Sequence, residues 1–186
     1  EGTIKKIIVT GCLAERYKQE LADEFPEVDA VVGIGCNEDI IDIIDHVIAN
    51  ERVIRFENKE RLPLTGQRII STLPFFAYLK IAEGCSNCCT YCAIPEEDVL
   101  KEAQWLADNG VTELIVIAQD STRYGIDLYK EYRLPSLLKK LCKIEGFKWI
   151  RVLYCYPERI TDELIEVMAS EKKIAKYIDI PVHLKQ

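Results

Sequence analysis

Apolar and polar positions alternate with two different periods over the first fifty residues. Apolar residues dominate 4–10 and 30–33, and such short runs predict strands. Residues 11–17 predict the turn into a helix that ends near Phe25 and Pro26. Asn37 is expected to cap a second helix, whose apolar residues recur with a 3.6-residue period at positions 40, 41, 43, 44, 47 and 48. This order of strands and helices predicts an α/β unit with a parallel sheet.

Residues 51–77 interrupt this order. They contain Pro63 and Pro74, and residues of this kind are typical of turns and loops. They therefore predict a linker, with one edge strand at 53–56. This linker separates an incomplete amino-terminal α/β unit, 1–50, from the rest of the chain.

From residue 78 onward, strand and helix patterns alternate regularly. The segment 114–118 (LIVIA) has the composition of a strand that is buried on both faces, and Thr161 is expected to cap the last helix. The other predicted elements are strands at 78–82, 150–154 and 177–180 and helices at 97–109 and 135–144. Such βαβ repeats are right-handed and curl into a barrel with its chemistry at the carboxyl ends of the strands. We therefore predict part of a TIM-like (β/α) barrel over 78–186.

The composition is that of an ordinary globular protein, with 48% hydrophobic and 30% charged residues. No apolar run approaches the roughly 18 residues of a membrane span. The sequence begins at Glu1 without a signal-like segment, so we expect a piece of a larger cytoplasmic protein. The 8 cysteines then indicate reduced thiols and metal ligands rather than disulfides. A net charge of −7 does not favour a nucleic-acid groove and would suit a basic protein partner.

The most informative motif lies within 83–95, which has the sequence EGCSNCCTYCAIP. Cys85, Cys89 and Cys92 follow one another in a C-x3-C-x2-C spacing. Thiolates are soft ligands that select iron–sulfur clusters, zinc or Cu(I). Three cysteines cannot fill all the iron corners of a cubane cluster. Either a distant residue supplies the last bond, or one iron stays open for a ligand.

Two other interpretations of these cysteines were weighed. Their spacing would place them on one face of a helix, where they would need no metal. Most residues between them form helices poorly, however, and Pro95 ends the run, so a loop is favoured. A zinc site completed by Cys88 is the second alternative. Adjacent thiolates such as those of Cys88 and Cys89 point apart on most backbones, which disfavours this site.

An apolar strand that leads into E-G-C-x3-C-x-Y-C-A-I-P resembles the first strand and cluster loop of the radical S-adenosylmethionine enzymes. The resemblance implies that Cys85, Cys89 and Cys92 bind a 4Fe-4S cluster. It also implies that S-adenosylmethionine binds the open iron through its amino and carboxylate groups. The bound S-adenosylmethionine would take the place of a fourth protein ligand.

The sequence G-C-L-A-E-R-Y, which begins at Gly11, resembles a segment of the amino-terminal domain of the methylthiotransferases within this superfamily. The resemblance implies that Cys12 is one of three ligands to a second, auxiliary 4Fe-4S cluster. The other two family cysteines are expected upstream of this chain, so Cys12 alone cannot hold that cluster. Cys12 also follows the carboxyl end of a predicted strand, where open α/β sheets place their ligands.

Two later segments are more specific. A-Q-D-S-T-R-Y-G-I-D-L-Y (118–129) and L-Y-C-Y-P-E-R-I-T-D-E-L-I (153–165) are similar to segments of the methylthiotransferases that modify a ribosomal protein, and the tRNA-directed ones differ there. The implied reaction replaces a β-hydrogen of one aspartate in the small-subunit ribosomal protein S-twelve by a methylthio group. Tyr91, Gln119 and Asp120 are implied contacts of S-adenosylmethionine or of its neighbours.

The implied partners are ribosomal protein S-twelve or the small ribosomal subunit, and a reductant such as flavodoxin or ferredoxin. We expect a monomer and no membrane association. Two alternatives stay open: a tRNA adenosine methylthiotransferase, and a non-catalytic module that uses the three-cysteine loop for metal binding or electron transfer.

The chain also departs from the family pattern. Cys88 stands where the family has a basic residue, and Pro95 meets Glu96 directly, without the arginine-rich segment of the family. We expect Cys88 to be incidental.

Overall fold

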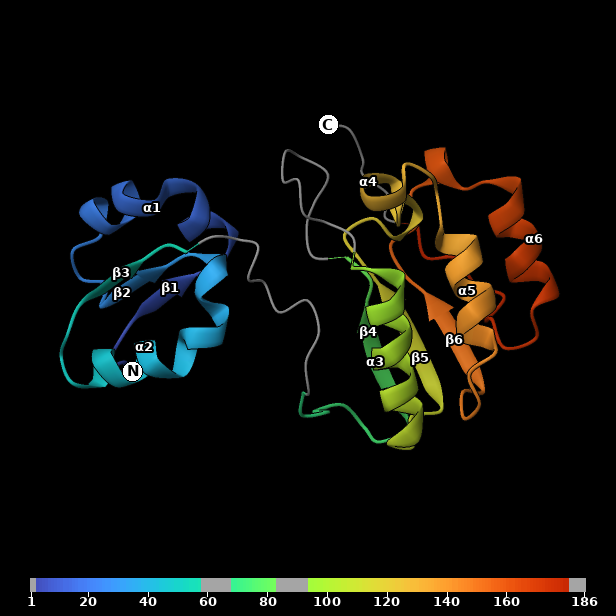
Figure 1. The fold of residues 1–186 in the computed structure, drawn as a ribbon, viewed down its shortest axis with the longest axis horizontal. Coiled ribbons are helices and arrows are strands. Elements are labelled where there is room, and N and C mark those ends of the chain that lie inside the picture. The colour runs from blue at the N-terminus through green and yellow to red at the C-terminus, as the bar shows by residue number, and fades with distance from the viewer. Residues whose placement is uncertain (1–2, 58–67, 83–93, 181–186) are drawn as a thin grey trace. The chain divides into compact units, whose positions relative to one another are not determined.

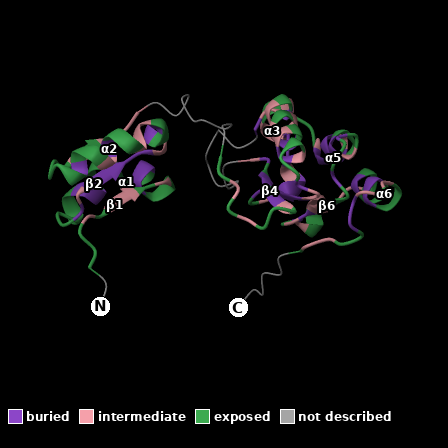
Figure 2. Cartoon of the chain, turned by 90° about the horizontal axis from the view of Figure 1, so that it is seen from below, coloured by how far each residue is buried: buried purple, intermediate pink, exposed green. Residues whose placement is uncertain are grey.

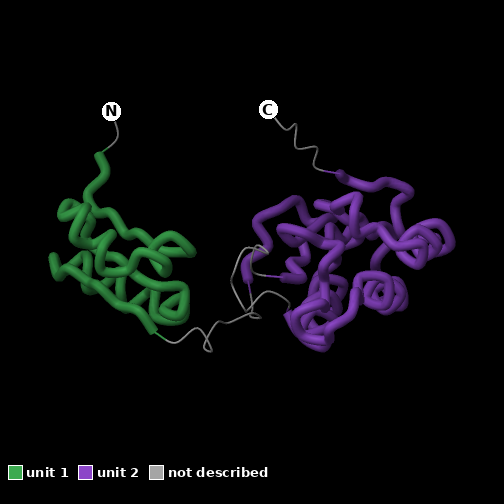
Figure 3. The backbone as a smooth tube through the Cα atoms, turned by 90° about the horizontal axis from the view of Figure 1, so that it is seen from above, with its two compact units in different colours: residues 1–63 green, residues 64–186 purple. Residues whose placement is uncertain are grey.

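The computed structural model describes residues 3–57, 68–82 and 94–180. The chain forms two compact units, residues 1–63 and 64–186, each with its own sheet (Figure 3). Both are α/β units, which confirms the predicted fold class at that level. No helix in the described part of the chain combines the length and apolar character needed to cross a membrane.

The first unit is a three-stranded parallel sheet with a helix on each face (Figure 1). Val31, on the central strand, packs with residues of the first helix, whereas its neighbours Ala30 and Val32 pack with the second. Alternate residues of a strand point to opposite faces, so one strand contributes to two small cores. The elements, with sheet order β1-β2-β3, are β1 (Ile8–Thr10), α1 (Cys12–Glu24), β2 (Ala30–Val32), α2 (Ile40–Ile48) and β3 (Val53–Arg55).

The first unit has the predicted order of elements and differs in detail. β3 is an edge strand, as predicted for 53–56. Asn37 does not cap α2, because a 3-10 turn over Ile34–Asp39 precedes the helix and Asn37 lies inside it. The cap prediction was therefore wrong. Helix α1 contains a break at Lys18, whose φ is 44°.

The second unit is also built on a three-stranded parallel sheet. One face of this sheet carries the core: Leu79, Leu114 and Ile150 are fully buried with residues of the surrounding helices (Figure 2). Tyr78 and Trp149, which directly precede two of these buried residues, are exposed. The elements, with sheet order β4-β5-β6, are β4 (Phe76–Lys80), α3 (Glu96–Asp108), β5 (Glu113–Ile117), α4 (Ile126–Tyr129), α5 (Leu134–Cys142), β6 (Trp149–Val152) and α6 (Asp162–Ser170).

Thr161 caps α6 as predicted, because its hydroxyl oxygen accepts a hydrogen bond from the Leu164 N–H at 3.2 Å. The predicted strand at 177–180 is not formed. Instead, β6 makes an isolated parallel bridge to Ile174, before this segment, and the Ile150 N–H donates to the Lys173 carbonyl at 2.8 Å. Within the segment, the Asp179 carbonyl accepts a hydrogen bond from the Cys155 N–H at 2.8 Å, and no regular ladder forms. The described strands of this unit form an open three-stranded sheet and no closed barrel.

Candidate functional site

A cavity of about 310 Å³ lies at the carboxyl ends of all three strands of the second unit. Its lining comes from the last residues of β4 and β5 and from the residues that follow each strand. These are Lys80, Ala82, Ile117, Ala118, Gln119 and Tyr154. Parallel α/β units place their ligands at this edge of the sheet, because the strands point their carboxyl ends toward the same connecting loops. The cavity is therefore the candidate functional site of the unit.

The three-cysteine loop enters and leaves beside this cavity. Ala82, which lines the cavity, is the last described residue before the loop, and Ile94 is the first one after it. The Ile94 N–H donates to the Ile81 carbonyl at 3.0 Å, so the two ends of the loop are joined at the end of β4. The predicted cluster ligands Cys85, Cys89 and Cys92 lie outside the described residues, as do Cys88 and Tyr91.

The end of this loop is also fixed by two tyrosines from the segment after β5. The buried Tyr124 donates its hydroxyl hydrogen to the Ile94 carbonyl at 3.1 Å. The Tyr129 hydroxyl oxygen accepts a hydrogen bond from the Glu96 N–H at 3.0 Å. Burial raises the pKa of Tyr124 far above its ordinary value of 10.0, so this hydroxyl remains a donor at any physiological pH.

Gln119 and Asp120, which are adjacent in the sequence, have different surroundings. Gln119 is exposed and lines the cavity. The Asp120 carboxylate is mostly buried and forms an ion pair with Arg159 at 2.7 Å. Its other oxygen accepts a hydrogen bond from the Thr122 hydroxyl. Asp120 thus connects the loop after β5 to the 3-10 turn Pro157–Arg159, which follows β6.

The sequence interpretation did not single out Lys80 and Tyr154, although both line the cavity. Lys80 is the last residue of β4, and Tyr154 lies two residues after β6. Their positions at strand ends are the sequence feature from which they could have been predicted. Cys155, directly after Tyr154, is fully buried in the core and does not line the cavity. Burial raises the pKa of the Cys155 thiol to about 11, so it is protonated at neutral pH.

In the first unit, Cys12 and Cys36 both follow strand ends but differ in exposure. Cys12 is exposed and is the first residue of α1. Cys36 is buried, and its Sγ donates to the Arg55 carbonyl at 3.4 Å. Burial raises the pKa of the Cys36 thiol. The described residues contain no group of three histidines, cysteines or carboxylates that could hold a metal ion.

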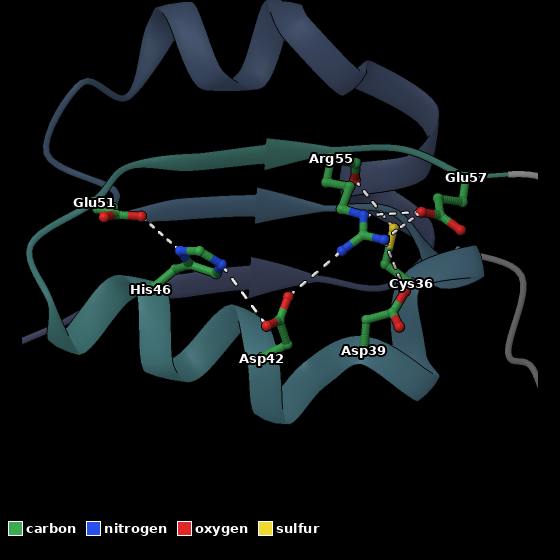
Figure 4. A network of polar contacts seen from close by, with 7 residues as sticks. All are labelled: Cys36, Asp39, Asp42, His46, Glu51, Arg55 and Glu57. Atoms are coloured by element: carbon green, nitrogen blue, oxygen red, sulfur yellow. Dashed lines mark hydrogen bonds and ion pairs between the residues drawn. The ribbon is translucent and has the colours of Figure 1, made fainter.

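A network of charged side chains extends along α2 and β3, from Arg55 and Glu57 near Cys36 to His46 and Glu51 at the other end of the helix (Figure 4). Arg55 pairs with Glu57 at 2.5 Å and with Asp39 at 3.1 Å. His46, on α2, contacts Asp42 of the same helix at 3.7 Å and Glu51, which follows the helix, at 2.5 Å. The hydrogen bond with Glu51, followed by the charges of Asp42 and Glu51, raises the pKa of His46. These side chains are partly to mostly accessible to solvent, so each ion pair contributes little to stability.

No protein-family model matches the chain. Among curated proteins, it is similar to several that are named ribosomal protein uS12 methylthiotransferase RimO. The protein from Thermoanaerobacter sp. (strain X514) is 48% identical over 190 residues, which cover 96% of this chain and 44% of the relative. The protein from Caldanaerobacter subterraneus subsp. tengcongensis is 52% identical over 182 residues, which cover 92% and 42%. The protein from Clostridioides difficile (strain 630) is 51% identical over 196 residues, which cover 97% and 43%.

The chain spans less than half the length of these curated relatives. Within that span, about half of the aligned residues are identical. The chain is therefore a homologue of the RimO methylthiotransferases over the segment that it shares with them.

Proposed function

We propose that this chain takes part in the methylthiolation of the β-carbon of an aspartate in ribosomal protein uS12. The observation that carries the proposal is the identity of 47% or more, over at least 92% of the chain, to relatives named for a uS12 methylthiotransferase. The two segments that resemble the ribosomal-protein branch, 118–129 and 153–165, include the cavity residues Ala118, Gln119 and Tyr154. The segments most specific to the ribosomal-protein branch thus contribute residues to the cavity at the strand ends, which supports the proposal.

The cavity is suitable for S-adenosylmethionine. Its lining combines apolar residues with an aromatic side chain, an amide and a lysine, and pockets of this kind bind organic cofactors. Cys85, Cys89 and Cys92 are the proposed ligands of a 4Fe-4S cluster, because three thiolates in a C-x3-C-x2-C spacing suit such a cluster and their loop begins after Ala82, which lines the cavity. A reduced cluster of this kind supplies the electron that starts radical chemistry on S-adenosylmethionine. The protein supplies binding, orientation and the exclusion of water.

The described residues have defined tasks in this proposal. Gln119 offers an amide donor and acceptor to the cofactor, and Tyr91 is a further proposed contact. Asp120 acts indirectly: its ion pair with Arg159 keeps the loops after β5 and β6 together beside the cavity. The parallel sheet with its core on one face supports the finer proposal that the unit is part of a (β/α) barrel.

Cys12 is the proposed ligand of an auxiliary 4Fe-4S cluster. Its exposure at the first turn of α1 supports this, since a ligand must be accessible to the metal. Cys36 is not a candidate for the same cluster, because its buried thiol already contacts the Arg55 carbonyl. The proposed partners are uS12 or the small ribosomal subunit and a flavodoxin or ferredoxin, with the protein acting as a monomer in the cytoplasm. A net charge of −7 favours a basic protein partner.

The experiment that tests the proposal measures which substrate gains mass. The full protein that contains this chain, reconstituted with iron and sulfide, is incubated with S-adenosylmethionine, a reductant and either uS12 or tRNA. We expect uS12 to gain the mass of a methylthio group less the hydrogen atom that it replaces, measured by mass spectrometry, and Cys89→Ala to abolish the gain. Cys142→Ala is the matched control, because this thiol lies on α5, away from the cavity. A gain on tRNA alone would contradict the proposed substrate.

A further inference from the structure

Tyr154 has a backbone conformation that is rare for its residue type. Its φ is 59°, in the left-handed region. This region is unfavourable for residues with a Cβ atom and is usually occupied by glycine, asparagine or aspartate. A non-glycine residue in such a conformation persists only where the surrounding structure determines it, and such residues are frequent at ligand-binding sites.

Two separate segments hold Tyr154 in this conformation. Its N–H donates to a carboxylate oxygen of Asp179 at 3.0 Å. Its carbonyl accepts a hydrogen bond from the Ser121 N–H at 3.0 Å. The neighbouring residues are held by the same two segments, because the Cys155 N–H donates to the Asp179 carbonyl and the Ser121 hydroxyl donates to the Leu153 carbonyl, at 2.8 and 2.6 Å.

The consequence of this arrangement is the position of the Tyr154 ring. Cys155, the next residue, is fully buried in the core, whereas Tyr154 is 46% exposed and lines the cavity. The other described non-glycine residues with a positive φ are Lys18, Asn50 and Lys130. All three are exposed and none lines the cavity, so Tyr154 alone combines this conformation with the site.

The chemistry of the cavity limits what would lie against this ring. Ala82, Ile117 and Ala118 contribute apolar atoms, Gln119 an amide with both donor and acceptor atoms, and Lys80 a long side chain with a charged end. An aromatic side chain beside apolar atoms favours a flat ring system, because stacking depends on the π-face of the ligand and hardly on its polar edge. An amide at the same site can pair with the edge of a heteroaromatic base.

We propose that Tyr154 is a contact residue for the nucleoside base of S-adenosylmethionine, and that Asp179 is a positioning residue that holds Tyr154 against the base. This inference rests on the proposed function, because it takes the cofactor from there. It adds to the site two residues that do not belong to the three-cysteine motif.

Binding of S-adenosylhomocysteine to the anaerobically reconstituted full chain, measured by calorimetry, tests the inference without any turnover. Tyr154→Gly removes the ring and suits a left-handed backbone, so we expect no loss of stability but a dissociation constant at least about five-fold higher. Tyr154→Phe keeps a ring and should lose less affinity than Tyr154→Gly. Lys130→Gly is the matched control, since it makes the same backbone change at an exposed residue outside the cavity and should leave the affinity unchanged.

The role of Asp179 is tested by a double-mutant cycle. Asp179→Ala should weaken binding in the unchanged chain and should have no further effect in Tyr154→Gly, because its action passes through the ring. An equal loss in both backgrounds would overturn the positioning role. Wild-type affinity in Tyr154→Gly would overturn the contact with the base and leave the proposed function intact. A failure of the unchanged chain to bind S-adenosylhomocysteine would overturn both.

Discussion

Tyr124 places a hydroxyl group in the core of the second unit, where it is 2% exposed. The hydroxyl donates to the carbonyl of Ile94, which is the first described residue after the three-cysteine loop. A buried carbonyl that loses its donor retains the cost of its own desolvation. This residue therefore connects the stability of the core to the end of the loop.

We predict that Tyr124→Phe lowers the free energy of unfolding by about 1 to 3 kcal/mol, because the Ile94 carbonyl loses its partner while the apolar packing is retained. Urea denaturation followed by circular dichroism measures the change. Tyr132→Phe is the control at an exposed tyrosine and should change the stability by less than about 0.5 kcal/mol. Equal stability of Tyr124→Phe and the unchanged chain would refute the role of this hydrogen bond.

His46 gives a pH-dependent prediction at the same scale. Its hydrogen bond with Glu51 raises its pKa above the ordinary value of 6.5, as do the charges of Asp42 and Glu51. A raised pKa means that the folded state binds the proton more tightly. The resulting stabilisation is fully present below pH 6.5 and is lost as the pH rises through the pKa of the folded state.

An NMR titration of the His46 ring should therefore show a midpoint above 6.5. Glu51→Gln should lower this midpoint, and added salt should lower it as well, because the pair is exposed. A midpoint at or below 6.5 in the unchanged chain would be inconsistent with the described contacts.

Prediction from sequence was most successful for elements whose signals are local. The apolar run at 114–118 became the central strand β5, and the hydroxyl of Thr161 caps α6. The prediction of a strand at 177–180 was wrong. A strand forms only when its backbone pairs with a neighbouring strand, and the local sequence pattern carries no information about that pairing. In the structure, the backbone and side chain of Asp179 instead bond to the residues after β6. The prediction that Asn37 caps α2 was wrong because Asn37 lies inside the 3-10 turn that precedes the helix.

The position of β5 between two strands gives a prediction for this element. Leu114 is fully buried, so Leu114→Ala should lower the free energy of unfolding by about 2 to 5 kcal/mol through lost contacts and a residual cavity. Ile165→Ala, at a half-exposed position of α6, is the control and should cost much less. Urea midpoints at constant slope measure both changes. Equal costs for the two variants would contradict the described core.

At the scale of the whole chain, the alternation of strand and helix patterns predicted the α/β class that both sheets have. Gln119 lines the cavity at the carboxyl edge of the second sheet, and its role as a cofactor contact stays a prediction. Lys80 and Tyr154 could not be predicted with the same ease, since the side chains that reach a cavity depend on backbone conformations such as the left-handed one of Tyr154. The roles of Cys85, Cys89 and Cys92 stay predictions.

We propose above all that the three-cysteine loop holds a 4Fe-4S cluster with an open iron. The most direct test reconstitutes the chain anaerobically with iron and sulfide and records the electron paramagnetic resonance of the reduced cluster with and without S-adenosylmethionine. We predict a 4Fe-4S signal that shifts on addition of S-adenosylmethionine and is absent in Cys89→Ala. A zinc-loaded site, or a cluster signal that does not respond, would contradict the account.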